Sequence, residues 1–227
     1  MTKPKIAVDI WSDVMCPWCA IGYTAFAQAV DELAGELEVE VRWMPFELNP
    51  GLPPEGKDQA QHLAEVYGRA PEETATMRAQ MLAVAERIGF SMAWTGEGPE
   101  PPGMMWNTFD AHKLLRWALA TAGPEAQTRL KLALLKAYLQ QRRNVSDHAM
   151  LLDLAEAEGF DRAKAAEALD DEALAIAVRS EEQRGRQGGI TSVPSFVIAG
   201  RYLFQGAREV ADYKLLLRQF AGLVQHA

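Results

Sequence analysis

Strand-like patterns of apolar residues occur twice near the start of the chain. Residues 6–11 are rich in β-branched and aromatic side chains, and in residues 39–44 Val and Trp side chains occupy alternate positions. Between these stretches, apolar residues recur at helical spacing over 20–34. The chain therefore opens with a predicted strand–helix–strand unit, which the Pro- and Gly-rich run at 49–56 ends.

Helical periodicity dominates the middle of the chain. Prolines and glycines separate the predicted helices, which are 58–69, 71–88, 108–122, 124–142, 147–158, 161–169 and 172–186. In the clearest of them the apolar residues follow i, i+3, i+4 spacing from Ala111 to Ala122, so this helix must pack against another element. We expect residues 57–187 to form a packed helical domain.

Strand-like residues return near the C-terminus. Apolar runs at 196–198 and 202–204 are separated by three residues and predict a hairpin, and 209–224 predicts a final amphipathic helix. The two ends of the chain, 1–56 and 188–227, are therefore expected to form one discontinuous domain that the helical domain interrupts.

One Gly- and Pro-rich loop, residues 95–103, can be neither helix nor strand. Such a loop either closes over a site or extends into solvent. Met104 and Met105, which follow it, can line an apolar pocket.

Composition and charge narrow the classes of partner. The 227 residues are 48% hydrophobic, enough for a sizeable core, and 23 basic against 31 acidic side chains give a net charge of -8. Dispersed basic residues and net negative charge argue against nucleic acid and anionic membranes. No stretch approaches the roughly 20 apolar residues of a membrane span, and the N-terminus shows no signal pattern, so a cytoplasmic location is expected.

The two cysteines, Cys16 and Cys19, flank Pro17 and Trp18 where the first strand gives way to the first helix. Proline suits the first helical position, since its missing amide would have no intrahelical partner there. Cys16 then caps the helix, whose unpaired amides stabilise a thiolate. Cys19, one turn on and pointing inward, can attack a mixed disulfide formed at Cys16, so a redox-active pair is predicted.

Two structural interpretations compete with this redox pair. A zinc site needs four ligands, whereas two cysteines supply only half and the four histidines show no ligand spacing, so no metal is expected. A structural disulfide across two residues would constrain the unfolded chain little. Trp18 can shape the docking surface, but its indole carries no cation that could stabilise the thiolate.

The chain resembles a known family in four segments: SDVMCPWC at 12–19, PFELNP at 45–50, NTFDAH at 107–112 and GITSVPSF at 189–196. It looks like the α/β thioredoxin fold with the large all-helical insertion of DsbA-like thiol oxidoreductases, and most resembles their cytosolic FrnE-like branch. It is also similar to kappa-class glutathione transferases and 2-hydroxychromene-2-carboxylate isomerases, which carry serine in place of Cys16.

The resemblance implies roles for residues far from the CXXC motif. Pro194 is expected to be cis and to lie against the sulfurs, leaving the Val193 backbone free to pair with a substrate chain. Asp13 lies three residues before Cys16, and an acidic residue near a helix start more often accepts hydrogen bonds from backbone amides than acts on a thiolate, so we favour the first role. His112 is expected to be a core histidine, with contact to a substrate at the domain junction as the alternative.

Two classes of function follow. The first is a disulfide oxidoreductase or isomerase with Cys16 as nucleophile and Cys19 as resolving thiol, acting on protein, peptide or small-molecule disulfides without a permanently bound cofactor. The second is a glutathione-dependent transferase or isomerase; in either class glutathione can be a co-substrate. Disulfide exchange needs Cys19, whereas activation of glutathione does not. A non-enzymatic interaction module is a third class, and the sequence specifies neither the substrate, the direction of electron flow nor the oligomeric state.

Overall fold

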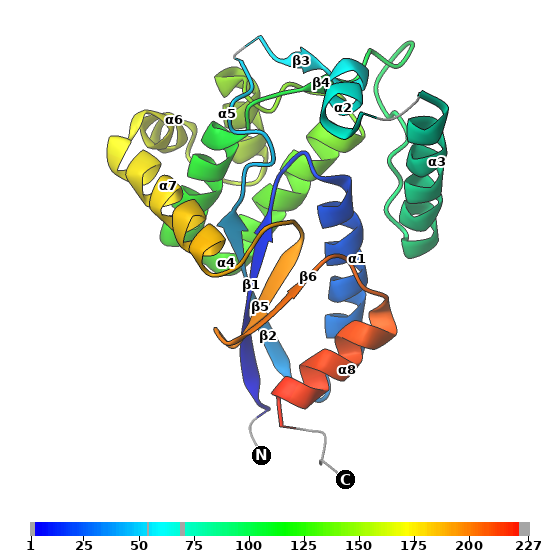
Figure 1. Cartoon of the computed structure of the whole chain (residues 1–227). Helices are drawn as coiled ribbons and strands as arrows, with labels where there is room; N and C mark the ends of the chain where they lie inside the picture. Colours follow the sequence, from blue (N-terminus) through cyan, green and yellow to red (C-terminus); the bar gives the residue numbers. More distant parts are fainter. Residues whose placement is uncertain (1–2, 54, 69–70, 223–227) are drawn as a thin grey trace.

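The computed structural model describes residues 3–53, 55–68 and 71–222. The strands are β1 (Lys5–Ser12), β2 (Glu38–Pro45), β3 (Lys57–Asp58), β4 (Met104–Met105), β5 (Ser195–Ile198) and β6 (Tyr202–Gln205). The helices are α1 (Pro17–Glu32), α2 (Gln59–Tyr67), α3 (Pro71–Ile88), α4 (Phe109–Leu139), α5 (His148–Ala157), α6 (Arg162–Asp170), α7 (Glu172–Gln187) and α8 (Val210–Phe220). Most of the chain between β2 and β5 is helical (Figure 1).

A four-stranded mixed sheet in the order β2-β1-β5-β6 carries both ends of the chain. β1 pairs in parallel with β2 through the α1 crossover and antiparallel with β5. α1 and α8 pack on each other beside the sheet, as Figure 1 shows. The ring of Phe26 from α1 lies 5.4 Å from those of Phe196 and Tyr213, so aromatic contacts hold sheet and helices together.

The hairpin between β5 and β6 turns at Ala199 and Gly200. Both residues have positive φ, 51° and 67°, as the two central residues of a type I′ turn require. The amide of Arg201 donates to the carbonyl of Ile198 over 3.0 Å and closes the turn. The predicted hairpin is confirmed, and it keeps β5 directed at the start of α1.

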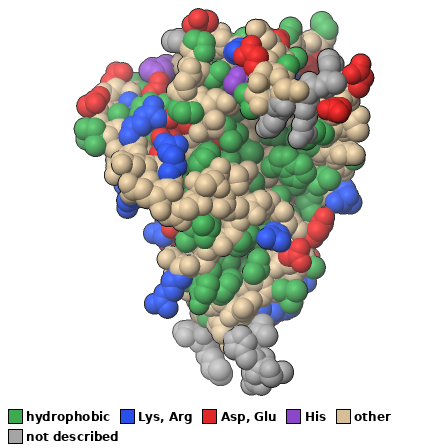
Figure 2. Space-filling model, in the orientation of Figure 1, with side chains coloured by type: hydrophobic (Ala, Val, Ile, Leu, Met, Phe, Trp, Pro, Cys, Tyr) green, Lys and Arg blue, Asp and Glu red, His purple; other side chains and the backbone are tan. Residues whose placement is uncertain are grey.

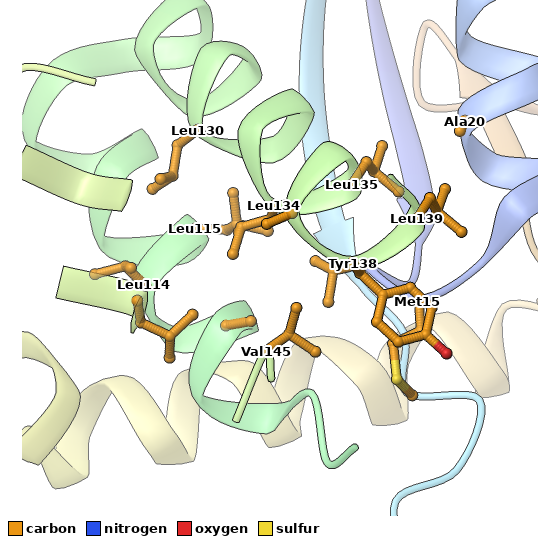
Figure 3. Packing of buried hydrophobic residues seen from close by; sticks show 14 of the residues in the cluster. Met15, Ala20, Leu114, Leu115, Leu130, Leu134, Leu135, Tyr138, Leu139 and Val145 are labelled. Atoms are coloured by element: carbon orange, nitrogen blue, oxygen red, sulfur yellow. The ribbon is translucent and has the colours of Figure 1, made fainter. Parts of the chain in front are cut away.

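The long helix α4 supplies the largest core. Gly123, with φ 83° and ψ -179°, breaks the helical geometry within it, at the boundary that the sequence predicted between two helices. On either side of this kink the leucines converge, as Figure 3 shows for Leu114, Leu115, Leu130 and Leu134. The core holds α5 and α6 against α4 and reaches Met15, next to the cysteines.

α4 is also attached to the edge strand β2. The side chain of Gln127 accepts a hydrogen bond from the amide of Trp43 over 2.8 Å and donates to its carbonyl over 2.9 Å. Gln127 thereby occupies the place of a neighbouring strand at this residue, since both polar groups would otherwise be unpaired in the interior. This attachment fixes α4 relative to β1 and the CXXC motif.

The structure differs from the sequence prediction mainly in a short strand pair. β3 pairs antiparallel with β4, with Lys57 opposite Met105, and two-residue strands are too short to leave a period in the sequence. α2 begins at Gln59 because the Asp58 carboxylate caps it, accepting from the Gln61 amide over 2.8 Å. The predicted helix ends at Arg69 and Val224 lie outside the described residues. No helix in the described part of the chain is long and apolar enough to cross a bilayer.

Candidate functional site

The CXXC motif lies where β1 ends and α1 begins. Cys16 is the N-cap of α1, with φ -82° and ψ 113°, and Pro17 occupies the first turn. The amide of Cys19 donates to the carbonyl of Cys16 over 3.1 Å, which folds the motif into one helical turn. Both thiols are free and both residues are buried, Cys16 4% and Cys19 0% exposed. Trp18, in contrast, is 42% exposed beside them.

A loop from the far end of the sequence faces the motif. The Val193–Pro194 peptide bond is cis, and the Sγ of Cys16 lies 3.8 Å from the carbonyl oxygen of Val193. α1 approaches this loop closely at Gly22, where an added Cβ would lie 3.0 Å from the Cγ of Pro194. Val193 is partly exposed, whereas Pro194 is buried. The structure thus places the Val193 carbonyl next to Cys16 and the cis proline beside Gly22 of α1.

Gln205, which the sequence analysis did not single out, organises this loop. Its Oε1 accepts hydrogen bonds from the amide and the hydroxyl of Ser192, over 3.1 and 2.8 Å, and from the amide and hydroxyl of Thr191, over 3.3 and 3.2 Å. Its Nε2 donates to the carbonyl of Gly189 over 3.0 Å. One side chain of β6 therefore holds the residues that precede Val193.

Asp13 lies beneath the motif and is fully buried. One carboxylate oxygen accepts from the amide of Met15 over 3.3 Å, and the other accepts from the amide of Leu48 over 2.8 Å. Nε2 of His112, also buried, lies 3.8 Å from the carboxylate, too far for a hydrogen bond but close enough to pair when protonated. Burial raises the pKa of Asp13, but His112 and the Leu48 amide outweigh it and hold the pKa below its usual value.

Asp13 and His112 are thus internal supports for the motif, since neither reaches the surface. Asp13 links the end of β1 to the segment after β2 through Leu48, and His112 joins both to α4. The arrangement fixes the turn that places Cys16 at the helix start.

Lys131 is a further buried residue at the site that the sequence analysis missed. It is 1% exposed on α4, and its ammonium lies 5.3 Å from the centre of the Trp43 ring. Burial lowers the pKa of Lys131 to about 8, while Cys19, Asp13 and Cys16 act in the opposite direction. The available signal was a lysine within the leucine stripe of α4, an unusual place for a charge that lacks a nearby partner.

The thiol of Cys19 has the complementary perturbation. Burial raises the pKa of Cys19 well above its usual range, the adjacent Cys16 raises it further, and Lys131 opposes both. At rest Cys19 is therefore a thiol rather than a thiolate. An ammonium buried with it is the group in a position to stabilise its thiolate form.

A second buried ionic cluster lies where α7 meets the segment after β2. The carboxylates of Glu47 and Glu182 are both fully buried, and the guanidinium of Arg179 bonds to each. Burial and the Glu182 carboxylate raise the pKa of Glu47, although Arg179 opposes them. Among the described residues, no group of three or more His, Cys, Asp or Glu side chains is arranged to hold a metal ion.

The fold and the site together define the class. A sheet in the order β2-β1-β5-β6, a CXXC pair at the start of α1 and a proline loop facing it describe a thioredoxin fold of the DsbA-like kind. A family model for a DsbA-like thioredoxin domain matches residues 7–218. The chain belongs to the DsbA-like thioredoxin domain family.

Individual relatives agree with this assignment. The uncharacterised protein YwbO of Bacillus subtilis is 28% identical over 89% of this chain and 95% of its own length. The crystal structure of a probable DsbA oxidoreductase, SCO1869 of Streptomyces coelicolor, is 28% identical, with a TM-score of 0.84 over 98% of this chain and 92% of that one. The cytosolic disulfide reductase DsbM of Pseudomonas aeruginosa, solved with glutathione, shares the fold at 17% identity, with a TM-score of 0.58 over 94% of this chain and 98% of that one.

Proposed function

We propose that the protein is a thiol–disulfide oxidoreductase in which Cys16 is the nucleophile and Cys19 the resolving thiol. One observation carries the proposal: Cys16, at the N-cap of α1, has its Sγ 3.8 Å from the Val193 carbonyl of the facing loop, with a second free thiol one helical turn away. The substrates are disulfides of proteins, peptides or small molecules.

The reaction follows from these positions. The Cys16 thiolate attacks one sulfur of the substrate disulfide, a bond forms from Cys16 to that sulfur, and the other substrate sulfur leaves as a thiolate that takes up a proton. Cys19 then loses its proton and attacks Cys16, which releases the second substrate thiol and leaves a Cys16–Cys19 disulfide. The substrate gains two electrons and the protein loses two, and a thiol reductant such as glutathione returns the protein to the dithiol.

The facing loop supplies a place for the substrate chain. The partly exposed Val193 backbone can pair with an extended peptide in β fashion, which would hold a substrate cysteine against Cys16. We include Pro17, Trp18 and Pro194 in this docking surface. The glutathione complex of DsbM supports glutathione as a co-substrate here, and the cytosolic reductase activity in its name supports a cytoplasmic setting where thiols are mostly reduced.

Single cysteine variants test the proposal. Cys19→Ser should form a mixed disulfide with substrate that persists, because no thiol resolves it, whereas Cys16→Ser should form none and lose disulfide reduction. Mass spectrometry of the intact protein after exposure to a peptide disulfide measures both. If Cys16→Ser instead keeps full catalytic turnover with glutathione, the glutathione-dependent transferase or isomerase class, which carries serine at this position, is correct and the proposal is wrong.

A further inference from the structure

The edge strand β2 is covered over only part of its length. The sheet runs in the order β2-β1-β5-β6, so one side of β2 has no neighbouring strand. Near its end, Gln127 bonds to the amide and the carbonyl of Trp43, which both point outward. At its start, the amide of Glu38 points the other way and donates to the carbonyl of Pro4 over 2.9 Å, next to β1. The two ends of β2 therefore fix which residues turn their polar groups outward.

Val39 and Val41 are such residues. Successive residues of a strand direct their amides and carbonyls to alternate edges, so these two point outward like Trp43. Among the residues that the structure describes, none bonds to these outward groups. We call residues 38–42 the open edge. It has room for an added strand of about five residues, roughly 16 Å long, before Gln127 closes it. An unpaired edge of this kind is a template for another strand.

A groove of about 610 Å³ runs along the open edge. Tyr23 and Val30 of α1 line it together with Val39 and Val41, and all four are partly exposed where they pack on the core of the sheet. Residues of α4 just after its kink line it as well. The volume lies within the roughly 300–1,000 Å³ of ligand sites, so the groove can take several side chains of a bound segment.

The rim of this groove is acidic. Its two cations are already paired, Lys5 with Glu40 over 2.7 Å and Arg129 with Glu158 over 3.8 Å. Three exposed carboxylates at the rim make no ion pair or side-chain hydrogen bond with any residue that the structure describes: Asp31, Glu38 and Glu125. A segment that matches the groove is therefore extended, with apolar side chains on one face and basic side chains on the other.

A second copy of this chain does not offer such a segment. Two copies related by a twofold axis would bring the same acidic strand to each other, and the chain carries a net charge of -8. On the face drawn in Figure 2, Lys and Arg side chains are spread over the whole height of the molecule rather than gathered into a patch that could cover an acidic groove. The charges thus favour a different, basic partner.

We infer that the open edge binds an extended, basic segment of another polypeptide, which adds to the sheet as a further strand. Its backbone pairs with Val39 and Val41, its apolar side chains lie against Tyr23 and Val30, and its basic side chains face the unpaired carboxylates. Figure 1 shows the start of β1, beside this groove, at the opposite end of the sheet from the start of α1. A partner held here leaves Cys16 accessible, so the interaction goes beyond the proposed function.

The test uses the full chain and short blocked peptides, about as long as the open edge, that carry a fluorophore. Fluorescence anisotropy should show binding of a peptide in which Lys and Val alternate, weakening as salt is added, and no binding when Glu replaces Lys. Two N-methylated forms, one modified at every Lys and one at every Val, separate strand addition from attraction between charges. Since only one set of amides in an extended peptide can face β2, one form should bind at least about 10-fold more weakly than the other.

Charge-reversal variants locate the site. Glu38→Lys should weaken binding of the Lys-Val peptide about 10-fold and keep the rate of disulfide reduction. Glu167→Lys, the same change at an exposed position on α6, should leave binding unchanged. No binding, equal binding of the two N-methylated forms, or equal loss in both variants overturns the inference and leaves the proposed function standing. A dimer of the unmodified protein that Glu38→Lys dissociates, seen by analytical ultracentrifugation, would place a second copy at the open edge and overturn it as well.

Discussion

Cys16 and Cys19 are three residues apart, but their surroundings differ. Cys19 is completely buried and its pKa is raised, whereas Cys16 caps α1 and faces the Val193 loop. We therefore predict that iodoacetamide at mildly acidic pH labels Cys16 first, since only a thiolate reacts quickly. Peptide mapping by mass spectrometry measures the order, and faster labelling of Cys19 in the native protein would reverse the assigned roles.

Lys131 should control the step that Cys19 performs. Its ammonium favours the Cys19 thiolate, so Lys131→Met should slow resolution of a mixed disulfide at Cys16 by about 10-fold near neutral pH, because a smaller fraction of the resolving thiol is then ionised. The pH profile of this step should move to higher pH. Release of a chromophoric thiol from its mixed disulfide with Cys16 measures the rate directly.

A second lysine on the same helix gives a matched control. Lys113 is also buried, but its ammonium donates to the carbonyl of Leu169 at the end of α6, away from the cysteines. Lys113→Met should lower the free energy of unfolding and leave the pH profile of resolution unchanged. Lys131→Met should not lower the free energy of unfolding, because replacing a buried charge by an apolar side chain of similar length removes the cost of desolvating that charge. An unchanged pH profile in Lys131→Met would contradict the role given to Lys131.

At the scale of elements, β6 positions the loop before Val193 through Gln205. Gln205→Leu removes five hydrogen bonds to this loop, so substrate docking should weaken and KM should rise several-fold, while alkylation of Cys16 proceeds at its usual rate. Gln219→Leu, on the exposed side of α8, is the control and should change neither quantity. A loss of Cys16 reactivity equal to the loss of kcat/KM would show a general structural defect instead.

The contact of α7 with the segment after β2 should be pH-dependent. Folding raises the pKa of the Glu47 carboxyl group. Such a group lowers the free energy of unfolding as the pH rises from its pKa in the unfolded chain, about 4.3, through its higher pKa in the folded protein. Glu47→Gln removes this cost and should raise Tm at neutral pH by about 2–4 °C for each kcal/mol relieved. Thermal melts at neutral pH and below pH 4.3 measure it; a gain that is as large at the acidic pH would exclude the carboxyl repulsion as its cause.

At the scale of the whole molecule, the redox potential decides the direction of electron flow. The position of Cys16 at the N-cap of α1 stabilises its thiolate and so favours the reduced, dithiol form. Trp18, between the cysteines, carries no cation that could stabilise the thiolate further. We expect a potential between about -180 and -270 mV, less oxidising than the about -120 mV of DsbA, so that a glutathione pool at about -220 to -320 mV keeps the dithiol. Equilibration in glutathione buffers measures it, and Trp18→His should move it upward. A value at or above that of DsbA, or a downward move, would refute this expectation.

Much of the fold followed from local patterns. The positions of the cysteines, the strand–helix–strand unit around them and the final hairpin depend on residues close in sequence, and the structure has each of them. The loop at 95–103 has no regular structure, as expected; its Thr95 amide donates to the carbonyl of Gln140 over 3.0 Å at the end of α4. The division into 1–56 with 188–227 and 57–187 stays a prediction.

What the sequence by itself determined is thus the chemistry that can occur and the elements that carry it, because residue type and periodicity act over short distances along the chain. Only the tertiary structure decided which distant groups meet. Cys16 and Val193 are 177 residues apart, and the hydrogen bonds of Gln205 and the burial of Lys131 near Cys19 depend on how β6 and α4 pack. Periodicity shows that a face is buried but not which side chain lies opposite, so these contacts required the folded molecule.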